Sequence, residues 1–324
     1  MTNLHAELVV QPGSRADSAR LACGWMSEGR RRLFPDFDRI LETAGPGTVR
    51  GGDPPDDDDA PWGPPGGLWA QVVVRQQPQA IGGTTTPYSA RNWRRALDGL
   101  ERSQPYLVRL DMMPLDQAGR PVSAGPPATL TVQRSQHDPR WARFEAEAPD
   151  RLVPWAGTPD VPLDWAGFVK EQAGAVGAHY GHVTDDATSH GTALERALLG
   201  VLVEPPGIPR CRDVLRGYSW VTIAAARLAA RLGGAGALTA SGCLDEVSVL
   251  PGGQVFLRAT PVLAEYEGAA VRRVFGVLAP VLPAGRPDPE AVSGSRVRLV
   301  LDANAADGAG AANGADGAGG GVDP

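Results

Sequence analysis

Apolar and polar residues alternate one by one along several stretches of the chain, which is the pattern of strands with one buried face. Two such stretches, Val247–Val249 and Val255–Ala259, flank Pro251-Gly252-Gly253, a sequence that favours a tight turn, and together they predict a hairpin. A β-type run from Tyr218 to Ile223 predicts a further strand. The other alternating stretches are residues 69–75, 106–112, 130–132 and 142–146.

Other stretches repeat their apolar residues every three or four positions and therefore predict helices. Val271, Val274, Phe275 and Leu278 form one such stripe. The sequence from Thr192 to Glu195 has the form of a capping box that opens a helix. The remaining helices are expected at residues 16–26, 37–41, 92–102 and 162–176, and in an Ala/Leu/Arg-rich segment that ends at the glycine pair 233–234.

The order strand, helix, strand, strand, helix occurs twice along the chain, the first time with one additional strand. We therefore predict an α+β fold made of two βαββαβ-like halves, each an antiparallel sheet covered by helices on one face. The second half would close with a strand at residues 296–301. Its core is expected to contain six apolar side chains: Trp220, Leu228, Val255, Leu257, Val271 and Phe275.

Composition sets the expected boundaries of these halves. Residues 46–67 are rich in Pro, Gly and Asp and predict a linker, whereas residues 302–324 are low-complexity Gly, Ala and Asp and predict a disordered tail. The expected organisation is a helical N-terminal extension at 1–45, the linker at 46–67, α+β halves at 68–203 and 204–301, and the tail at 302–324.

The formal net charge of −6 argues against a general nucleic-acid binder, because phosphate contacts require a clustered basic face. The N-terminus has no apolar stretch of the secretion-signal type, and no segment reaches the length of a membrane span. Three widely spaced cysteines, without the close pairs of a metal knuckle, fit a reducing compartment. We therefore expect a cytoplasmic protein that binds neither nucleic acid nor a membrane.

The densest cluster of candidate metal ligands is the stretch "HYGHVTDDATSH", which contains His179, His182, Asp185, Asp186 and His190. Imidazole and carboxylate groups are suitable ligands for zinc or a similar divalent ion. His179 and His182 would share a face only on a helix, and Gly177 and Gly181 disfavour a helix here. On a strand the two imidazoles would point to opposite faces. We therefore expect a loop with hydrogen-bonded or solvated histidines and no bound metal.

No complete catalytic motif occurs in the sequence. Ser241 and Cys243 lack the flanking glycines of a nucleophile elbow. The glycine-rich residues 232–238 follow a predicted helix, whereas a phosphate-binding loop precedes one. Tyr218 and Trp220 would suit base stacking only beside a basic groove, so a core position is favoured for both. We expect a protein that is not an enzyme and needs no cofactor.

The region from 210 to 282 resembles the C-terminal part of a bacterial immunity-type family associated with type VI secretion and polymorphic toxins. The resemblance is carried by the Gly-aromatic-x-Trp segment Gly217–Trp220, the Leu-Gly-Gly helix end at Leu232–Gly234 and the turn at Gly252-Gly253. It implies an intracellular α+β protein that binds a cognate toxin without a cofactor. The long N-terminal part and the glycine-rich tail depart from the family pattern.

The leading hypothesis is therefore a cytoplasmic, non-enzymatic binding protein, of the immunity type that sequesters a toxin-like protein partner. Two alternatives stay open: a metal-dependent enzyme centred on residues 179–190, and a structural component of a larger bacterial assembly. The sequence leaves the oligomeric state and the binding surface open.

Overall fold

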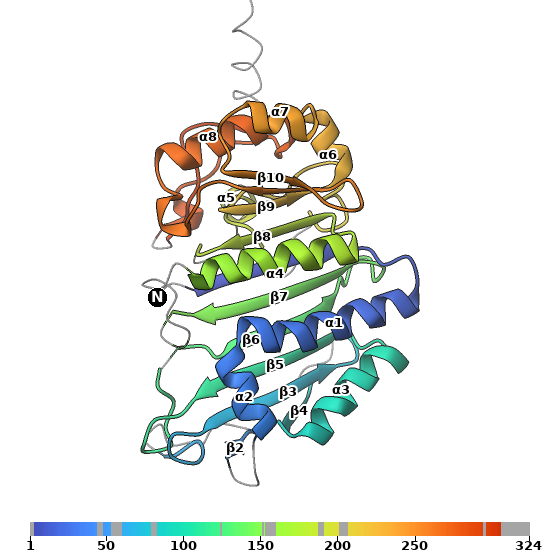
Figure 1. Cartoon of the computed structure of the whole chain (residues 1–324), viewed down its shortest axis with the longest axis vertical. Coiled ribbons are helices and arrows are strands. Elements are labelled where there is room, and N and C mark those ends of the chain that lie inside the picture. The colour runs from blue at the N-terminus through green and yellow to red at the C-terminus, as the bar shows by residue number, and fades with distance from the viewer. Residues whose placement is uncertain are drawn as a thin grey trace, which may run out of the picture.

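The computed structural model of the chain describes residues 3–43, 48–52, 60–78, 83–123, 125–150, 152, 160–186, 191–200, 207–293 and 296–305. The strands of this part of the chain form one sheet in the order β10-β11-β9-β8-β1-β7-β6-β5-β3-β2, with β4 also paired to β3 (Figure 1). Neighbouring strands are antiparallel except for β2 and β3.

The strands of this sheet are β1 Asn3–Val10, β2 Val49–Arg50, β3 Leu68–Arg75, β4 Thr84–Pro87, β5 Leu107–Pro114, β6 Ala128–Arg134, β7 Ala142–Pro149, β8 Tyr180–Thr184, β9 Val221–Ala224, β10 Glu246–Val249 and β11 Val255–Arg258. The helices are α1 Arg15–Leu33, α2 Pro35–Thr43, α3 Ala90–Arg102, α4 Asp160–Val176, α5 Ala193–Leu199, α6 Ala226–Arg231, α7 Gly234–Ala240 and α8 Ala269–Leu278. Within the described residues, none of the helices combines the length and hydropathy that crossing a bilayer needs.

Helices α1, α2, α3 and α4 lie on one face of the sheet, whereas α6, α7 and α8 gather at its β10 end (Figure 1). The indole of Trp25 on α1 packs against Phe144 on β7 and Phe168 on α4, with ring centroids 5.8 and 5.1 Å apart. This contact fixes which face of β7 is covered, because alternate residues of a strand point to opposite faces. The predicted α+β class, with antiparallel strands and helices on one face, is confirmed.

The two predicted halves nevertheless share a single sheet, and residues 3–10 are the reason. We expected only helices in the N-terminal extension, but Asn3–Val10 forms β1 between β7 and β8. Leu4, Ala6 and Leu8 alternate with polar residues, as a strand with one covered face requires. The alternation is short and its partners are distant in sequence, so the local pattern alone did not identify the strand.

Three further expectations differ from the structure. Residues 180–184 form strand β8 rather than a loop, and Gly181 lets it approach β1, since a Cβ there would lie 2.5 Å from the Leu8 side chain. Residues 234–240 form helix α7, which begins at the second glycine of the pair, where we expected a helix to end. Residues 296–301, expected to form a strand, belong to no strand of the described sheet. Residues 306–324 of the predicted tail and 53–59 of the predicted linker lie outside the described residues.

The six apolar side chains predicted for the core of the second half are all buried, and they belong to one cluster. Phe275 on α8 contributes to it through the ring of Tyr218, with centroids 5.9 Å apart. The predicted hairpin is also present, with Val247 opposite Leu257 and Val249 opposite Val255. Strand β9, the β10–β11 hairpin and helix α8 therefore fold as their sequence patterns predict.

Replacing Phe275 with Ala should lower the free energy of unfolding by about 3 kcal/mol, because it removes a buried ring and leaves a cavity beside Tyr218. Urea unfolding would measure the loss. Val249→Ala is the matched control, since Val249 is 63 % exposed and should cost little. Equal losses for the two variants would show that α8 does not depend on this core.

Candidate functional site

The face of the sheet opposite α1 and α4 carries polar side chains along most of its width. Since Phe144 points toward α1, its neighbours Arg143 and Glu145 point to the other face. The strand register then aligns residues from five strands in two rows across this face. One row contains Arg109, Thr131, Glu145, Glu7 and His182, and the next contains Asp111, Thr129, Glu147, His5 and Thr184.

A pocket of about 520 Å³ is hollowed into this polar face. Its floor is formed by side chains of β1, β5, β6 and β7, and its walls include Pro126 and Pro127 before β6, Asp186 after β8 and Arg196 on α5. The floor residues are Asn3, His5, Leu107, Arg109, Thr129, Thr131, Gln133, Glu145 and Glu147. The pocket therefore has a largely polar and charged lining.

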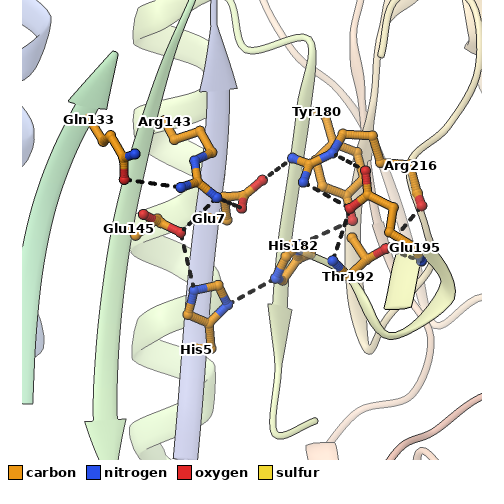
Figure 2. A network of polar contacts seen from close by, with 10 residues as sticks. All are labelled: His5, Glu7, Gln133, Arg143, Glu145, Tyr180, His182, Thr192, Glu195 and Arg216. Atoms are coloured by element: carbon orange, nitrogen blue, oxygen red, sulfur yellow. Dashed lines mark hydrogen bonds and ion pairs between the residues drawn. The ribbon is translucent and has the colours of Figure 1, made fainter. Parts of the chain in front are cut away.

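A network of buried charges lies beside the pocket (Figure 2). Arg216 donates to both carboxylate oxygens of Glu195, each over 2.9 Å, and also to Glu7. Arg143 lies 3.8 Å from the other Glu7 oxygen and 3.4 Å from Glu145. The side chains of Glu7 and Arg216 are completely buried, so each depends on these partners in place of water.

Local sequence motifs position Thr192 and Glu195 in this network. The predicted capping box is present: Thr192 accepts from the Glu195 backbone N–H over 3.1 Å, and the Glu195 carboxylate accepts from the Thr192 N–H over 3.0 Å. The Thr192 hydroxyl also donates to the Arg216 carbonyl. Gly217 allows this approach, since a Cβ there would lie 2.6 Å from the Thr192 hydroxyl oxygen.

Burial and the neighbouring charges lower the pKa of two groups in this network. Burial alone would raise the pKa of Glu7, but Arg216 and Arg143 outweigh it and lower the pKa to about 2. Burial, together with His5, lowers the pKa of His182 to about 3. At neutral pH the network therefore holds an ionised Glu7 next to a neutral His182.

A chain of hydrogen-bonding groups leads from the interior to the pocket. The Tyr180 hydroxyl lies 3.0 Å from His182 Nδ1, and His182 Nε2 lies 3.0 Å from His5 Nδ1 (Figure 2). His5 Nε2 lies 3.9 Å from Glu145, where the side chains are 19 % and 15 % exposed. These four groups connect the buried Tyr180 to the pocket floor, so His5 and Glu145 are the members that a ligand could reach.

The predicted histidine and aspartate cluster is dispersed in the structure. His182 belongs to the network just described, whereas His179 contacts Arg212 and the ring of Trp141. Asp185 forms a two-point ion pair with Arg298, with distances of 2.6 and 2.8 Å.

The neighbouring Asp186 accepts from the backbone N–H of Arg298 over 2.7 Å, and His190 lies outside the described residues. The pKa of His179 is lowered to about 4 by burial and by Arg212. Within the part of the chain that the structure describes, no three His, Cys, Asp or Glu side chains are placed to hold a metal ion. The expected divergence of His179 and His182 on a strand agrees with their separate partners.

Several residues of the site were not found from the sequence: His5, Glu7, Arg143 and Arg216. Glu7 follows an alternating apolar pattern and precedes Leu8, Val9 and Val10, so its position inside a buried strand was the available signal. Nothing near Arg143 or Arg216 indicates burial, because their partners are brought together only by the sheet.

Comparison with known proteins places this chain in no established family. No protein-family model matches it, and no curated protein matches it. A solved structure described as Pseudomonas aeruginosa T6SS protein PA0821 aligns with a TM-score of 0.49 and 15 % identity, covering 94 % of this chain and 80 % of that one. The function therefore has to be argued from the residues of this chain.

Proposed function

We propose that this chain is a non-enzymatic binding protein that holds a protein partner against the polar face of its sheet. The observation that carries the proposal is the pocket of about 520 Å³ on the face opposite α1 and α4. The pocket lies beside α5, whose Arg196 forms part of its wall, and the alignment of polar side chains in rows supplies donors and acceptors for a macromolecule. The partner contact would be centred on the pocket.

The finer proposal is that the partner is toxin-like and that the chain sequesters it, as the sequence resemblance at 210–282 implies. In this proposal Gly217 and the turn at Gly252-Gly253 are structural, because Gly217 packs against Thr192 and Gly253 has a positive φ of 80°. These motif residues would therefore support the fold of the family rather than contact the partner.

Site-specific photo-crosslinking in the cells that produce the protein tests this proposal. A benzophenone side chain at Thr129, on the pocket floor, is expected to crosslink one discrete protein. The same group at Arg94 is the control and should not crosslink that protein. Arg94 is exposed on α3, which lies on the other face of the sheet. The proposal is wrong if both positions capture the same set of proteins or if Thr129 captures none.

A further inference from the structure

Strand β6 lies between β5 and β7, and on the polar face its side chains are neutral whereas those of its two neighbours are charged. On the polar face, β6 contributes the short hydroxyl side chains of Thr129 and Thr131. The neighbouring strands contribute Arg109 and Asp111 on one side and Glu145 and Glu147 on the other. The short residues leave a trough about two strand spacings wide, roughly 9.5 Å, between the charged side chains. An extended segment or a long side chain fits such a trough.

The two sides of the trough differ in charge. On the β5 side, Arg109 Nε lies 2.7 Å from an Asp111 oxygen, so these two charges neutralise each other. On the β7 side, Glu147 accepts from the neutral amide of Asn3, and no cation is within ion-pair distance of it among the described residues. The β7 side therefore carries negative charge that its neighbours do not offset.

Glu145 adds to this negative charge, because the buried network to which it belongs contains more carboxylates than guanidinium groups. Among the described residues, these ion pairs connect three carboxylates, Glu7, Glu145 and Glu195, with two guanidinium groups, Arg143 and Arg216. The five side chains therefore carry a formal charge of −1 in total. Glu145 lines the pocket and is the most exposed of the three carboxylates at 15 %, so the excess negative charge acts on a ligand in the pocket.

The remaining charged residues of the pocket wall do not cancel this excess. Asp186 and Arg196 contribute one charge of each sign. Asn3 adds an acceptor, because its side-chain oxygen is buried and has no hydrogen-bond partner among the described residues. The pocket therefore offers two carboxylates and an amide oxygen to a donor with a positive charge.

We propose that the polar sheet face docks a basic segment of the protein partner, with one arginine side chain of that segment seated between Glu145 and Glu147. Alternate residues of a strand on one face are about 6.7 Å apart, so a planar guanidinium with five N–H donors can reach both carboxylates, which the compact ammonium of lysine does less well. The net charge of −6 would also attract a basic partner at long range. This inference rests on the proposed function.

Titration of the purified full chain with N-acetyl-arginine amide tests the inference directly. NMR signals of the Thr129 and Thr131 methyl groups should shift saturably with the arginine probe. N-acetyl-glutamine amide and N-acetyl-aspartate amide should produce no saturable shift, and a lysine probe should bind more weakly. Equal effects of the arginine and glutamine probes, or binding of the aspartate probe alone, would overturn the inference.

Variants that each remove one negative charge show which carboxylates bind the arginine probe. Glu147→Gln and Glu145→Gln should each weaken binding of the arginine probe about tenfold or more, because each removes a charge-assisted hydrogen bond. Asp98→Asn removes the same charge from α3, away from the pocket, and should leave binding unchanged. Glu147→Gln is the decisive variant, since the partner of Glu147 among the described residues is the neutral amide of Asn3 and its loss should not disturb the buried network. Undiminished binding by Glu147→Gln would contradict the placement.

The outcomes separate this inference from the proposed function. If Thr129 crosslinks one partner and neither glutamate variant weakens that crosslink, the face binds a protein but not through an arginine, and the inference fails alone. If the arginine probe binds at Glu147 while Thr129 crosslinks no protein, the cation site stands and the proposed function fails.

Discussion

Replacement of Arg216 by Met is expected to lower the free energy of unfolding by about 5 kcal/mol, because it leaves the buried Glu195 without its cation and Glu7 with Arg143 alone, 3.8 Å away. Glu7 and Glu195 are 0 % and 5 % exposed and cannot recover their hydration from water. Urea unfolding at neutral pH measures the effect. Arg227→Met is the control, since Arg227 pairs with Asp213 at a site that is 75 % exposed and should cost less than about 1 kcal/mol.

A triple variant tests whether the orphaned carboxylates are the cause. Arg216→Met combined with Glu7→Gln and Glu195→Gln removes the negative charges of the two carboxylates that lose Arg216 in the single variant. It should recover more than half of the lost free energy, because isolated buried charges cost more than buried neutral amides. If the triple variant is no more stable than the single one, the loss comes from packing of the Arg216 side chain over Tyr180 and not from charge.

The parts of the fold that the sequence predicted are those whose signals lie within a few residues of each other. The β10–β11 hairpin depends on one turn, α8 depends on one apolar stripe, and the capping box spans Thr192 to Glu195. The position of β1 depends on pairing with β7 and β8, whose residues are more than 130 positions away. No local pattern contains that information, so two halves were expected where one sheet exists.

The candidate site was harder to predict for the same reason. For the cluster from His179 to His190 we expected histidines that do not converge on a metal, and its described members have separate partners. The network that does exist joins Glu7, Arg143 and Arg216, which are far apart in sequence. Among the described residues, His182 is the one member of the predicted cluster that belongs to the observed network.

Acidification from pH 7 to pH 4.5 should lower the free energy of unfolding by about 1.5 kcal/mol, because the effects of two histidines outweigh the opposite effect of one aspartate. His182 has a folded pKa of about 3, below the ordinary value of 6.5, so the unfolded chain takes up the proton first and His182 alone removes about 2.5 kcal/mol. His179, with a folded pKa of about 4, acts in the same direction, but its half-exposed ring limits the loss to about 1 kcal/mol.

Asp186 opposes the two histidines. Burial raises its pKa from 3.8 to about 6, against the effect of the Arg298 N–H, so the folded chain takes up this proton first as the pH falls. Protonation of Asp186 therefore contributes about 2 kcal/mol of stability across the same pH interval. Glu7 stays ionised in this interval, because its pKa of about 2 lies below it.

Two single variants separate these contributions in opposite directions. Asp186→Asn removes the stabilising protonation, so the loss between pH 7 and pH 4.5 should grow to about 3.5 kcal/mol. His182→Gln removes the largest destabilising group, so acidification over the interval should stabilise this variant by about 1 kcal/mol, because the gain from Asp186 then exceeds the loss from His179. Urea unfolding at several pH values gives the slopes, and the NMR signal of His182 at pH 4.5 should be that of a neutral ring. If His182→Gln has the same slope as the unmodified chain, the buried imidazole is not the group that takes up the proton on unfolding, and the loss of stability in acid has another source.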